Sequence, residues 1–152
     1  MHLEEILTPQ RCYPALPGIS KKRLITTVSE LLAEDLGYLS ANEIFNSLMA
    51  REQLGSTGLG NGIAIPHCRV SECRDVVGAL VTLDKGIDFN SVDSKPVDLI
   101  FVLIVPEQKS DEHVRILADL ARMFNDEDLC FTLRQTENNE DLYHIVITYQ
   151  GA

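Results

Sequence analysis

The sequence has 152 residues, of which 45% are hydrophobic and 24% charged, as expected of one globular domain with its own hydrophobic core. The formal net charge of −10 at pH 7 argues against nucleic acid as a partner, because phosphate backbones are bound by clustered Lys and Arg side chains. No apolar run approaches the roughly 20 residues that span a bilayer, and residues 1–5 lack the features of a signal peptide. We therefore expect a cytoplasmic protein without a membrane partner.

The N-terminal part of the chain predicts a lead-in followed by two helices. Residues 1–18 contain three prolines and a glycine and are predicted to be irregular. The first helix is predicted to begin after Ser20, a typical N-cap residue, and to end at Gly37. A capping box that begins at Ser40 predicts the second helix. The apolar residues of the first helix recur at helical spacing: Leu24, Ile25, Val28, Leu31, Leu32 and Leu36.

The middle of the chain favours strands. Residues 76–83 and 97–105 are rich in β-branched side chains and are bounded by turn formers, as is typical of largely buried strands. Residues 63–65 are predicted to form a shorter strand. The sequence Asp-Lys-Gly at 84–86 indicates a turn.

Helical spacing returns after Pro106, where three further helices are predicted. Their apolar positions are Val114, Leu117, Ala118, Ala121 and Phe124 in the first, Leu129 and Leu133 in a second that Asp126 can cap, and Leu142, Ile145, Val146 and Tyr149 in the last. Helices, then strands, then helices predict an α/β fold in which residues 1–152 form a single domain. Its sheet is expected to be sandwiched by helices on both faces, with the strand order left open.

A glycine-rich segment lies between the second helix and the first long strand. Four of the nine glycines stand at positions 55, 58, 60 and 62, and glycine permits positive φ angles and close approach of N–H groups to an anion. Ser56 and Thr57 add hydroxyl donors, so Ser56, Thr57 and Gly58 are candidate phosphate-binding residues. The segment fits neither nucleotide-binding template, because Ile63 stands where G-x-G-x-x-G needs glycine and Asn61 replaces the P-loop lysine.

His67 is the strongest candidate for chemistry. It follows the short apolar strand and the rigid Pro66, which places its imidazole at a strand edge or loop beside the glycine-rich segment. Arg51 lies upstream, and His113 opens a helix downstream. Neutral imidazole is a competent nucleophile at cytosolic pH, because its reference pKa is about 6.5. A phosphoryl group on a ring nitrogen also leaves readily, so a histidine can both accept the group and pass it on.

The pattern of residues 51–67 is Arg-Glu-x-Leu-Gly-Ser-Thr-Gly-x-Gly-x-Gly-Ile-Ala-Ile-Pro-His. It resembles the phosphorylation-site motif of the fructose, mannitol and nitrogen-regulatory IIA family of the bacterial phosphotransferase system. The resemblance continues through residues 87–89, 95–99 and 112–113, so that it covers nearly the whole chain. It implies a mixed sheet flanked by helices, in agreement with the fold expected from the elements.

The resemblance also implies roles for individual residues. His67 would be the phospho-acceptor, with the phosphoryl group on Nε2, and Arg51 and His113 would lie at the site. No metal or other cofactor is expected. Cys68 stands where the family pattern usually has glycine, which alters the local backbone requirement but removes no chemical group.

The helix opening at residues 20–23, together with the lack of attached membrane or carrier domains, favours the nitrogen-regulatory branch. The expected donor is then a phosphohistidine carrier protein (HPr- or NPr-like). The expected targets are regulatory proteins of nitrogen metabolism and potassium transport, which makes the protein a relay or regulator rather than a metabolic enzyme. The alternative within the family is a sugar-specific IIA subunit that passes the phosphoryl group to a fructose- or mannitol-type permease.

Two remote alternatives use the same residues differently. In a cysteine enzyme, Cys68 would be the nucleophile and His67 or His113 the base. Adjacent residues of an extended segment point to opposite sides, which disfavours a pair formed by His67 and Cys68. A zinc site would use His67, Cys68, Cys73 and His113, but these residues lack the short paired spacing typical of zinc ligands.

Overall fold

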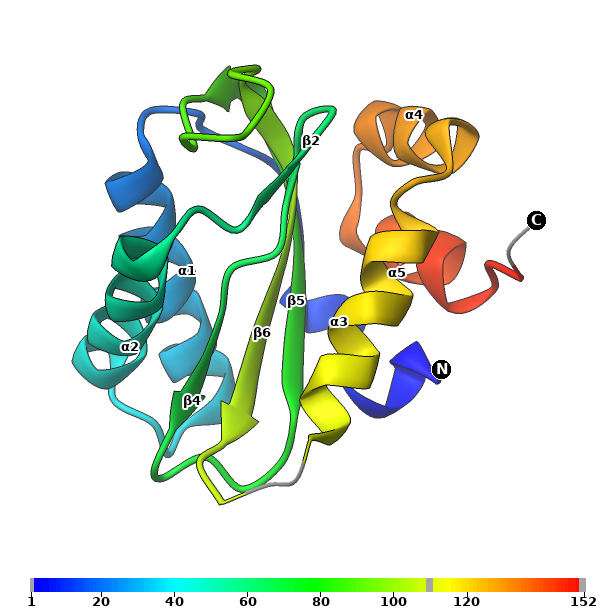
Figure 1. The fold of residues 1–152 in the computed structure, drawn as a ribbon. Helices are drawn as coiled ribbons and strands as arrows, with labels where there is room; N and C mark the ends of the chain where they lie inside the picture. The colour runs from blue at the N-terminus through cyan, green and yellow to red at the C-terminus, as the bar shows by residue number, and fades with distance from the viewer. Residues whose placement is uncertain (1, 109–110, 151–152) are drawn as a thin grey trace.

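The computed structural model describes residues 2–108 and 111–150, which form a mixed sheet between two layers of helices (Figure 1). The elements in chain order are η1 (Leu3–Glu5), η2 (Pro9–Arg11), β1 (Cys12–Leu16), α1 (Lys21–Leu36), α2 (Ala41–Leu54), β2 (Gly58–Gly60), β3 (Ile63–Ala64), β4 (His67–Val70), β5 (Val77–Ile87), β6 (Val97–Pro106), α3 (Glu112–Met123), α4 (Glu127–Gln135) and α5 (Asn139–Ile147). This is the single-domain α/β architecture predicted from the sequence.

The sheet is built around the antiparallel pair β5 and β6. The strand order is β1-β5-β6-β3-β2, and β4 also pairs with β6. Strand β1 runs parallel to β5, and both β3 and β4 run parallel to β6. Ile63 of β3 lies opposite Leu99, and His67 of β4 lies opposite Leu103, so the short strands follow one another along β6. Pro66 lies between these two strands, and its carbonyl accepts the backbone N–H of Leu103 at 2.9 Å.

Strand β6 is buried on both faces, which explains its continuous apolar sequence. Ile100, Val102 and Ile104 pack toward α1 and α2. The alternate residues of β6 pack toward α3, α4 and α5 on the other face: Leu99, Phe101, Leu103 and Val105. The two cores therefore share one strand, and every second residue of that strand belongs to the same core.

The helix boundaries confirm the caps predicted from the sequence. The Ser20 hydroxyl accepts the Arg23 N–H at 3.1 Å, and α1 ends at Gly37, whose φ of 77° is left-handed. The Ser40 hydroxyl accepts the Glu43 N–H at 3.3 Å at the start of α2. Asp126 likewise accepts two backbone N–H groups at the start of α4. These contacts are local, which is why the sequence could predict them.

Two predictions about local structure were wrong. Residues 1–18 are not irregular throughout, because Cys12–Leu16 form β1 and Cys12 pairs with Leu80 of β5. A proline within the strand is tolerated because β1 is an edge strand of the sheet. Residues 84–86 do not form a turn: β5 continues through them to Ile87, with a shift in its register against β6 after Thr82.

Candidate functional site

His67 begins β4, and the pairing of that strand with β6 fixes its backbone. Its side chain is half-buried, whereas the next residue, Cys68, is buried in the core formed with α1 and α2. The alternation expected of a strand therefore separates the two side chains, as the sequence predicted.

The hydrogen bond made by the His67 ring identifies its tautomer. Nδ1 lies 2.8 Å from the carbonyl oxygen of Ile65. Because a carbonyl oxygen can only accept, Nδ1 carries the hydrogen and Nε2 carries the lone pair. Burial lowers the pKa of the His67 imidazole below its ordinary value, and Arg51 and His113 lower this pKa as well, against the opposite effect of the Ile65 hydrogen bond. The ring is therefore neutral at neutral pH, with Nε2 as its nucleophilic atom.

His67 lines a cavity of about 580 Å³, to which α2, β4, β6 and α3 contribute side chains. Helix α2 contributes Arg51, strand β4 contributes His67 and Arg69, and α3 contributes His113. The remaining lining residues are Ser47, Ala50, Leu54, Cys68, Leu103 and Val105. The structure thus brings together the three residues that were predicted to lie at the site from positions far apart in the sequence.

Arg51 and His113 line this cavity from two different helices, α2 and α3. Arg51 lies in the last turn of α2, and its Nη1 donates to the carbonyl of Gly55 at 2.8 Å. His113 lies in the first turn of α3, with its Nε2 3.4 Å from Nη2 of Arg69. Nδ1 of His113 is buried and has no hydrogen-bond partner among the described residues. Because a guanidinium can only donate, Nε2 of His113 is the acceptor in its contact with Arg69 and Nδ1 carries the hydrogen.

Arg69 is a site residue that the sequence reasoning missed. It stands two positions after His67, so the strand period places both side chains on one face of β4. Its Nη1 donates to the Glu107 carbonyl at 3.0 Å. Period-two alternation counted from His67 was the signal that could have found it.

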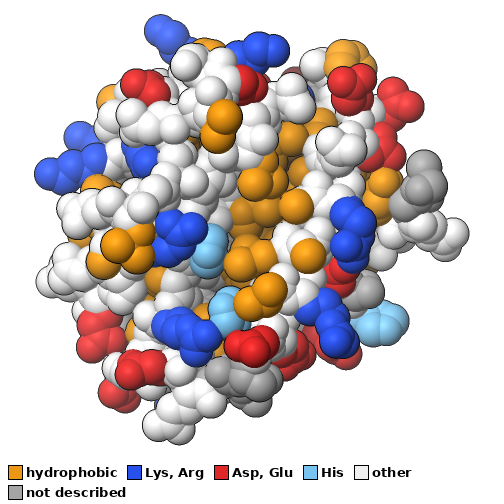
Figure 2. All heavy atoms as spheres, viewed as in Figure 1, with side chains coloured by type: hydrophobic (Ala, Val, Ile, Leu, Met, Phe, Trp, Pro, Cys, Tyr) orange, Lys and Arg blue, Asp and Glu red, His pale blue; other side chains and the backbone are white. Residues whose placement is uncertain are grey.

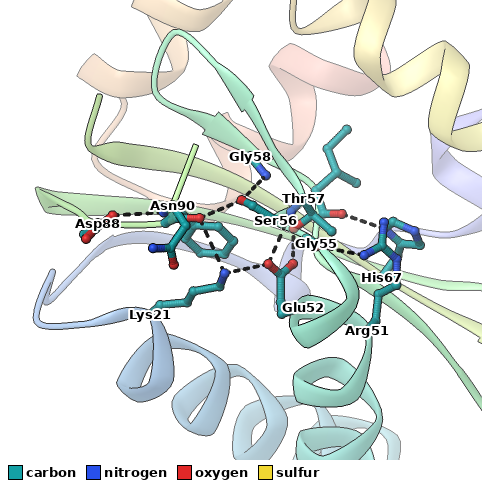
Figure 3. Close-up of polar contacts among 12 residues, drawn as sticks. Lys21, Arg51, Glu52, Gly55, Ser56, Thr57, Gly58, His67, Asp88 and Asn90 are labelled. Carbon is teal, nitrogen blue, oxygen red and sulfur yellow. Dashed lines mark hydrogen bonds and ion pairs between the residues drawn. The ribbon is translucent and has the colours of Figure 1, made fainter. Parts of the chain in front are cut away.

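The hydroxyl groups of Ser56 and Thr57 do not point at His67. Ser56 donates to the Phe89 carbonyl at 2.6 Å and accepts the Gly58 N–H at 3.0 Å. Thr57 is buried, and both its hydroxyl and its N–H bond to the Glu52 carboxylate. Figure 3 shows these contacts to one side of Arg51 and His67. A role for Ser56, Thr57 and Gly58 in phosphate binding thus stays a prediction.

Much of the glycine-rich segment has a structural explanation. Strands β2 and β3 form an antiparallel hairpin, and the residues between them, Asn61 and Gly62, have φ angles of 58° and 82°. An Asn-Gly pair with positive φ at both positions is the preferred turn of a two-residue hairpin. Gly58 is required for a different reason, because a Cβ there would overlap the Ser91 hydroxyl.

The side-chain environment disfavours both remote alternatives. Burial raises the pKa of the Cys68 thiol to about 12, which leaves almost no thiolate at neutral pH. Within residues 2–108 and 111–150, no group of three or more His, Cys, Asp or Glu side chains is placed to hold a metal ion. In the same part of the chain, no helix is long and apolar enough to cross a membrane.

The surface around the cavity differs from the acidic average of the chain. Arg51 and Arg69 place two guanidinium groups beside the histidines, although the net charge is −10. Figure 2 shows this face, with Lys or Arg side chains next to histidine and with hydrophobic side chains exposed nearby. Leu54 and Val114 are 85% and 55% exposed on the two helices that flank the cavity. The face therefore combines positive charge with apolar contact area.

Comparisons with known proteins agree with this arrangement. Residues 5–149 match the family described as the phosphoenolpyruvate-dependent sugar phosphotransferase system, EIIA 2. The chain is 47% identical to a nitrogen regulatory protein of Pseudomonas aeruginosa over 152 residues, which cover 100% of this chain and 99% of the relative. It is 40% identical to a nitrogen regulatory protein of Escherichia coli over 134 residues, which cover 88% of this chain and 82% of the relative.

Solved structures share the fold. The nitrogen regulatory protein IIA-Ntr of Neisseria meningitidis is 37% identical, with a TM-score of 0.88 over 95% of this chain and 98% of that chain. IIA mannitol of Escherichia coli, at 19% identity and a TM-score of 0.78, shows the fold alone over 92% of this chain and 98% of that chain. The chain therefore belongs to the EIIA 2 family of the phosphotransferase system, in its nitrogen-regulatory branch.

Proposed function

We propose that this protein takes a phosphoryl group from a phosphohistidine carrier protein (HPr- or NPr-like) onto Nε2 of His67, and that it controls target proteins according to its phosphorylation state. The observation that carries this proposal is the hydrogen bond from Nδ1 of His67 to the Ile65 carbonyl. It leaves the Nε2 lone pair for the cavity that Arg51 and His113 also line. Residues 1–152 would act as one type-2 IIA domain in the cytoplasm.

The transfer step exchanges one N–P bond for another. The Nε2 lone pair of His67 forms the new bond to phosphorus as the bond to the donor ring breaks, and the bonding electron pair returns to the donor nitrogen. The donor leaves as neutral imidazole when its second nitrogen carries a proton. The His67 ring keeps its Nδ1 proton and gains the positive charge, so its hydrogen bond to the Ile65 carbonyl becomes charge-assisted.

The protein contributes position and charge to this reaction. In a loose transition state, negative charge accumulates on the three equatorial oxygens of the phosphoryl group and must be met by fixed donors. Arg51, Arg69 and His113 line the cavity and supply such donors. No step requires a metal ion or another cofactor.

The exposed side chains around the cavity support a docking role for this face. A carrier that delivers a phosphohistidine must bring it to Nε2 of His67, so the carrier must cover the rim where Leu54 and Val114 are exposed. Interfaces of such transient complexes are at the small end of the size range. Regulatory targets in nitrogen metabolism and potassium transport would use the same face and respond to the charge on His67.

The alternative is a sugar-specific IIA subunit, which would use the same acceptor chemistry. The names of the relatives favour the regulatory branch, because the proteins of Pseudomonas aeruginosa and Escherichia coli are nitrogen regulatory proteins. A PTS system fructose-specific EIIA component of Haloferax volcanii is 31% identical over 76% of this chain, less than either of these two relatives.

The proposed function is tested by incubating the protein with each phosphorylated carrier. We expect one acid-labile phosphate per chain, with ³¹P spectra that place it on Nε2, and none on the His67→Ala variant. Full labelling of that variant would overturn the assignment. Rapid onward transfer to a fructose- or mannitol-type IIB protein would favour the sugar-specific alternative.

A further inference from the structure

A buried ion pair lies beneath the segment that leads to His67. Nζ of Lys21, the first residue of α1, lies 2.7 Å from Oε1 of Glu52, in the last turn of α2. The side chains are only 17% and 2% exposed. Removing two charges from water is costly, so a buried pair of this kind needs further hydrogen bonds to offset its desolvation.

Thr57 supplies those hydrogen bonds to the Glu52 carboxylate. Its backbone N–H donates to Oε1 at 3.2 Å, and its hydroxyl bonds to Oε2. Lys21 is tied in as well, because its Nζ lies 3.4 Å from the Phe89 carbonyl and 4.6 Å from the centre of the Phe89 ring. Figure 3 shows Glu52 between Lys21 and the Thr57 backbone. The position of Thr57 is therefore set by the ion pair.

The Thr57 backbone connects this ion pair to the active histidine. The carbonyl of Thr57 accepts the N–H of Ile65 at 3.1 Å. The carbonyl of Ile65 in turn accepts Nδ1–H of His67 at 2.8 Å. Glu52, Thr57, Ile65 and His67 are thus linked in series, and the hydrogen bonds on the backbone of Thr57 and Ile65 fix where the acceptor of His67 Nδ1–H lies.

We propose that Lys21 and Glu52 are positioning residues for phosphoryl transfer, which fix the Thr57 and Ile65 backbone and thereby hold His67 in the tautomer whose Nε2 faces the cavity. The inference rests on the proposed function for its effect on rate. Its effect on the tautomer concerns the unphosphorylated protein and can be measured without any carrier.

The charge of Glu52 has the sign that the reaction needs. Once Nε2 is phosphorylated, the imidazole that keeps its Nδ1 proton carries positive charge. The Glu52 carboxylate favours that charge, since it acts to raise the pKa of His67 while Arg51 and His113 act to lower it. The carboxylate thus supports the ring from the buried side, and the arginine meets the phosphoryl group from the cavity side.

The first experiment compares Thr57→Val with Thr57→Ser in the full chain. Valine has nearly the same shape as threonine but has no hydroxyl for the Glu52 carboxylate, whereas serine keeps one. Long-range ¹H–¹⁵N spectra of the His67 side chain report the tautomer above its pKa. We expect a larger fraction of Nε2–H in Thr57→Val and about tenfold slower phosphorylation by carrier, with both values restored in Thr57→Ser.

The second experiment removes both charges at once in Lys21→Met/Glu52→Gln, which avoids leaving one buried charge unpaired. We expect the same shift in tautomer and at least as large a loss of rate. Asp35→Asn is the matched control, because it removes the charge of an α1 residue whose Oδ2 lies 3.1 Å from Nη1 of Arg11 in η2. Thr82→Val is the control for a buried hydroxyl, which in the native protein accepts the Ala15 N–H at 2.8 Å.

These outcomes separate the positioning role from a purely structural one. If the controls lower the melting temperature as much as the test variants but leave the tautomer and the rate unchanged, the inference is supported. An unchanged tautomer and rate in both folded test variants would overturn it. Failure of the wild-type protein to accept phosphate would contradict the proposed function, while the tautomer measurement would still decide whether Glu52 positions His67.

Discussion

Arg51 and Gly55 are joined by a hydrogen bond of 2.8 Å from Nη1 to the carbonyl oxygen, across the end of helix α2. The bond holds the guanidinium at the wall of the cavity that contains His67. It uses one of the five N–H donors of the arginine, so the others remain able to meet a phosphoryl oxygen.

We expect Arg51→Ala to slow phosphorylation by about 10²–10³-fold, as loss of one preorganised donor does. Stability should change little, because the bond to Gly55 is exposed. Rapid-quench measurement of transfer, with thermal unfolding alongside, tests this expectation. Arg23→Ala, an exposed arginine at the start of α1, is the control and should transfer normally. Wild-type kinetics in a folded Arg51→Ala protein would remove Arg51 from the site.

The pKa of His67 should lie below that of an exposed histidine, because burial disfavours the charged form of the imidazole. Within the interval between the lowered folded pKa and the ordinary value of about 6.5, the unfolded state binds more protons than the folded state. Stability from this residue is therefore present above that interval and is lost as the pH falls through it. Denaturant unfolding should show a smaller loss of stability on acidification for His67→Gln than for the wild type. A ring that titrates above 6.5 by NMR would contradict this sign.

Phosphorylation should act as a local electrostatic switch. It adds up to about two negative charges beside Arg51 and Arg69, and the dense apolar cores on both faces of β6 resist rearrangement. Amide shifts are expected near residues 51–70 and 111–115. Shifts spread through β6 and α5 would refute a local switch. His67→Asp should mimic the phosphorylated form only in part, because it adds one charge at a shorter reach.

Apolar contacts at the rim of the cavity should contribute to carrier binding. Leu54 is 85% exposed, so Leu54→Asp should leave the melting temperature unchanged. We expect it to weaken productive encounter with the carrier, seen as an increase in KM of about tenfold with little change in kcat. Val92→Asp is a matched control, because Val92 is 93% exposed but does not line this cavity. If both substitutions raise the KM for the carrier equally, the cause is the added negative charge rather than the loss of an apolar contact at Leu54.

Cys68 should not take part in the chemistry. Its thiol is buried and its pKa is raised to about 12, so we expect slow reaction with thiol reagents in the folded protein. Cys68→Ala should still accept phosphate at a rate close to that of the wild type. Loss of transfer in a folded Cys68→Ala protein would revive the cysteine-enzyme alternative.

The elements that sequence reasoning predicted correctly depend on nearby residues or on burial from both sides. Ser20 caps α1 by accepting the N–H of Arg23, only three positions away. Strand β6 is recognisable because residues 99–105 form an unbroken apolar run. Strand β4 was missed because its four residues are ordered by pairing with β6, more than 30 positions later. Strand β1 was missed because prolines dominate its surroundings, and only the distant β5 makes it a strand.

The site was predictable to the extent that the motif specified it. Arg51, His67 and His113 meet at one cavity, as the resemblance implied. The hydroxyls of Ser56 and Thr57 lie elsewhere because they bond to the Phe89 carbonyl and the Glu52 carboxylate. Helical periodicity does not reveal that Glu52, at the end of α2, is buried and paired with Lys21. Its hydrogen bonds with Thr57 are therefore evident only from the structure.

The opposite orientation of His67 and Cys68 has a consequence for divergence among relatives. His67 is half-buried and Arg69 is exposed, whereas Cys68 and Val70 are buried in the core formed with α1 and α2. Substitutions at the even positions are constrained by volume, and those at the odd positions by the partner's surface. A change at position 68 therefore alters the volume of the core, while a change at position 69 alters the surface beside His67 without repacking the interior.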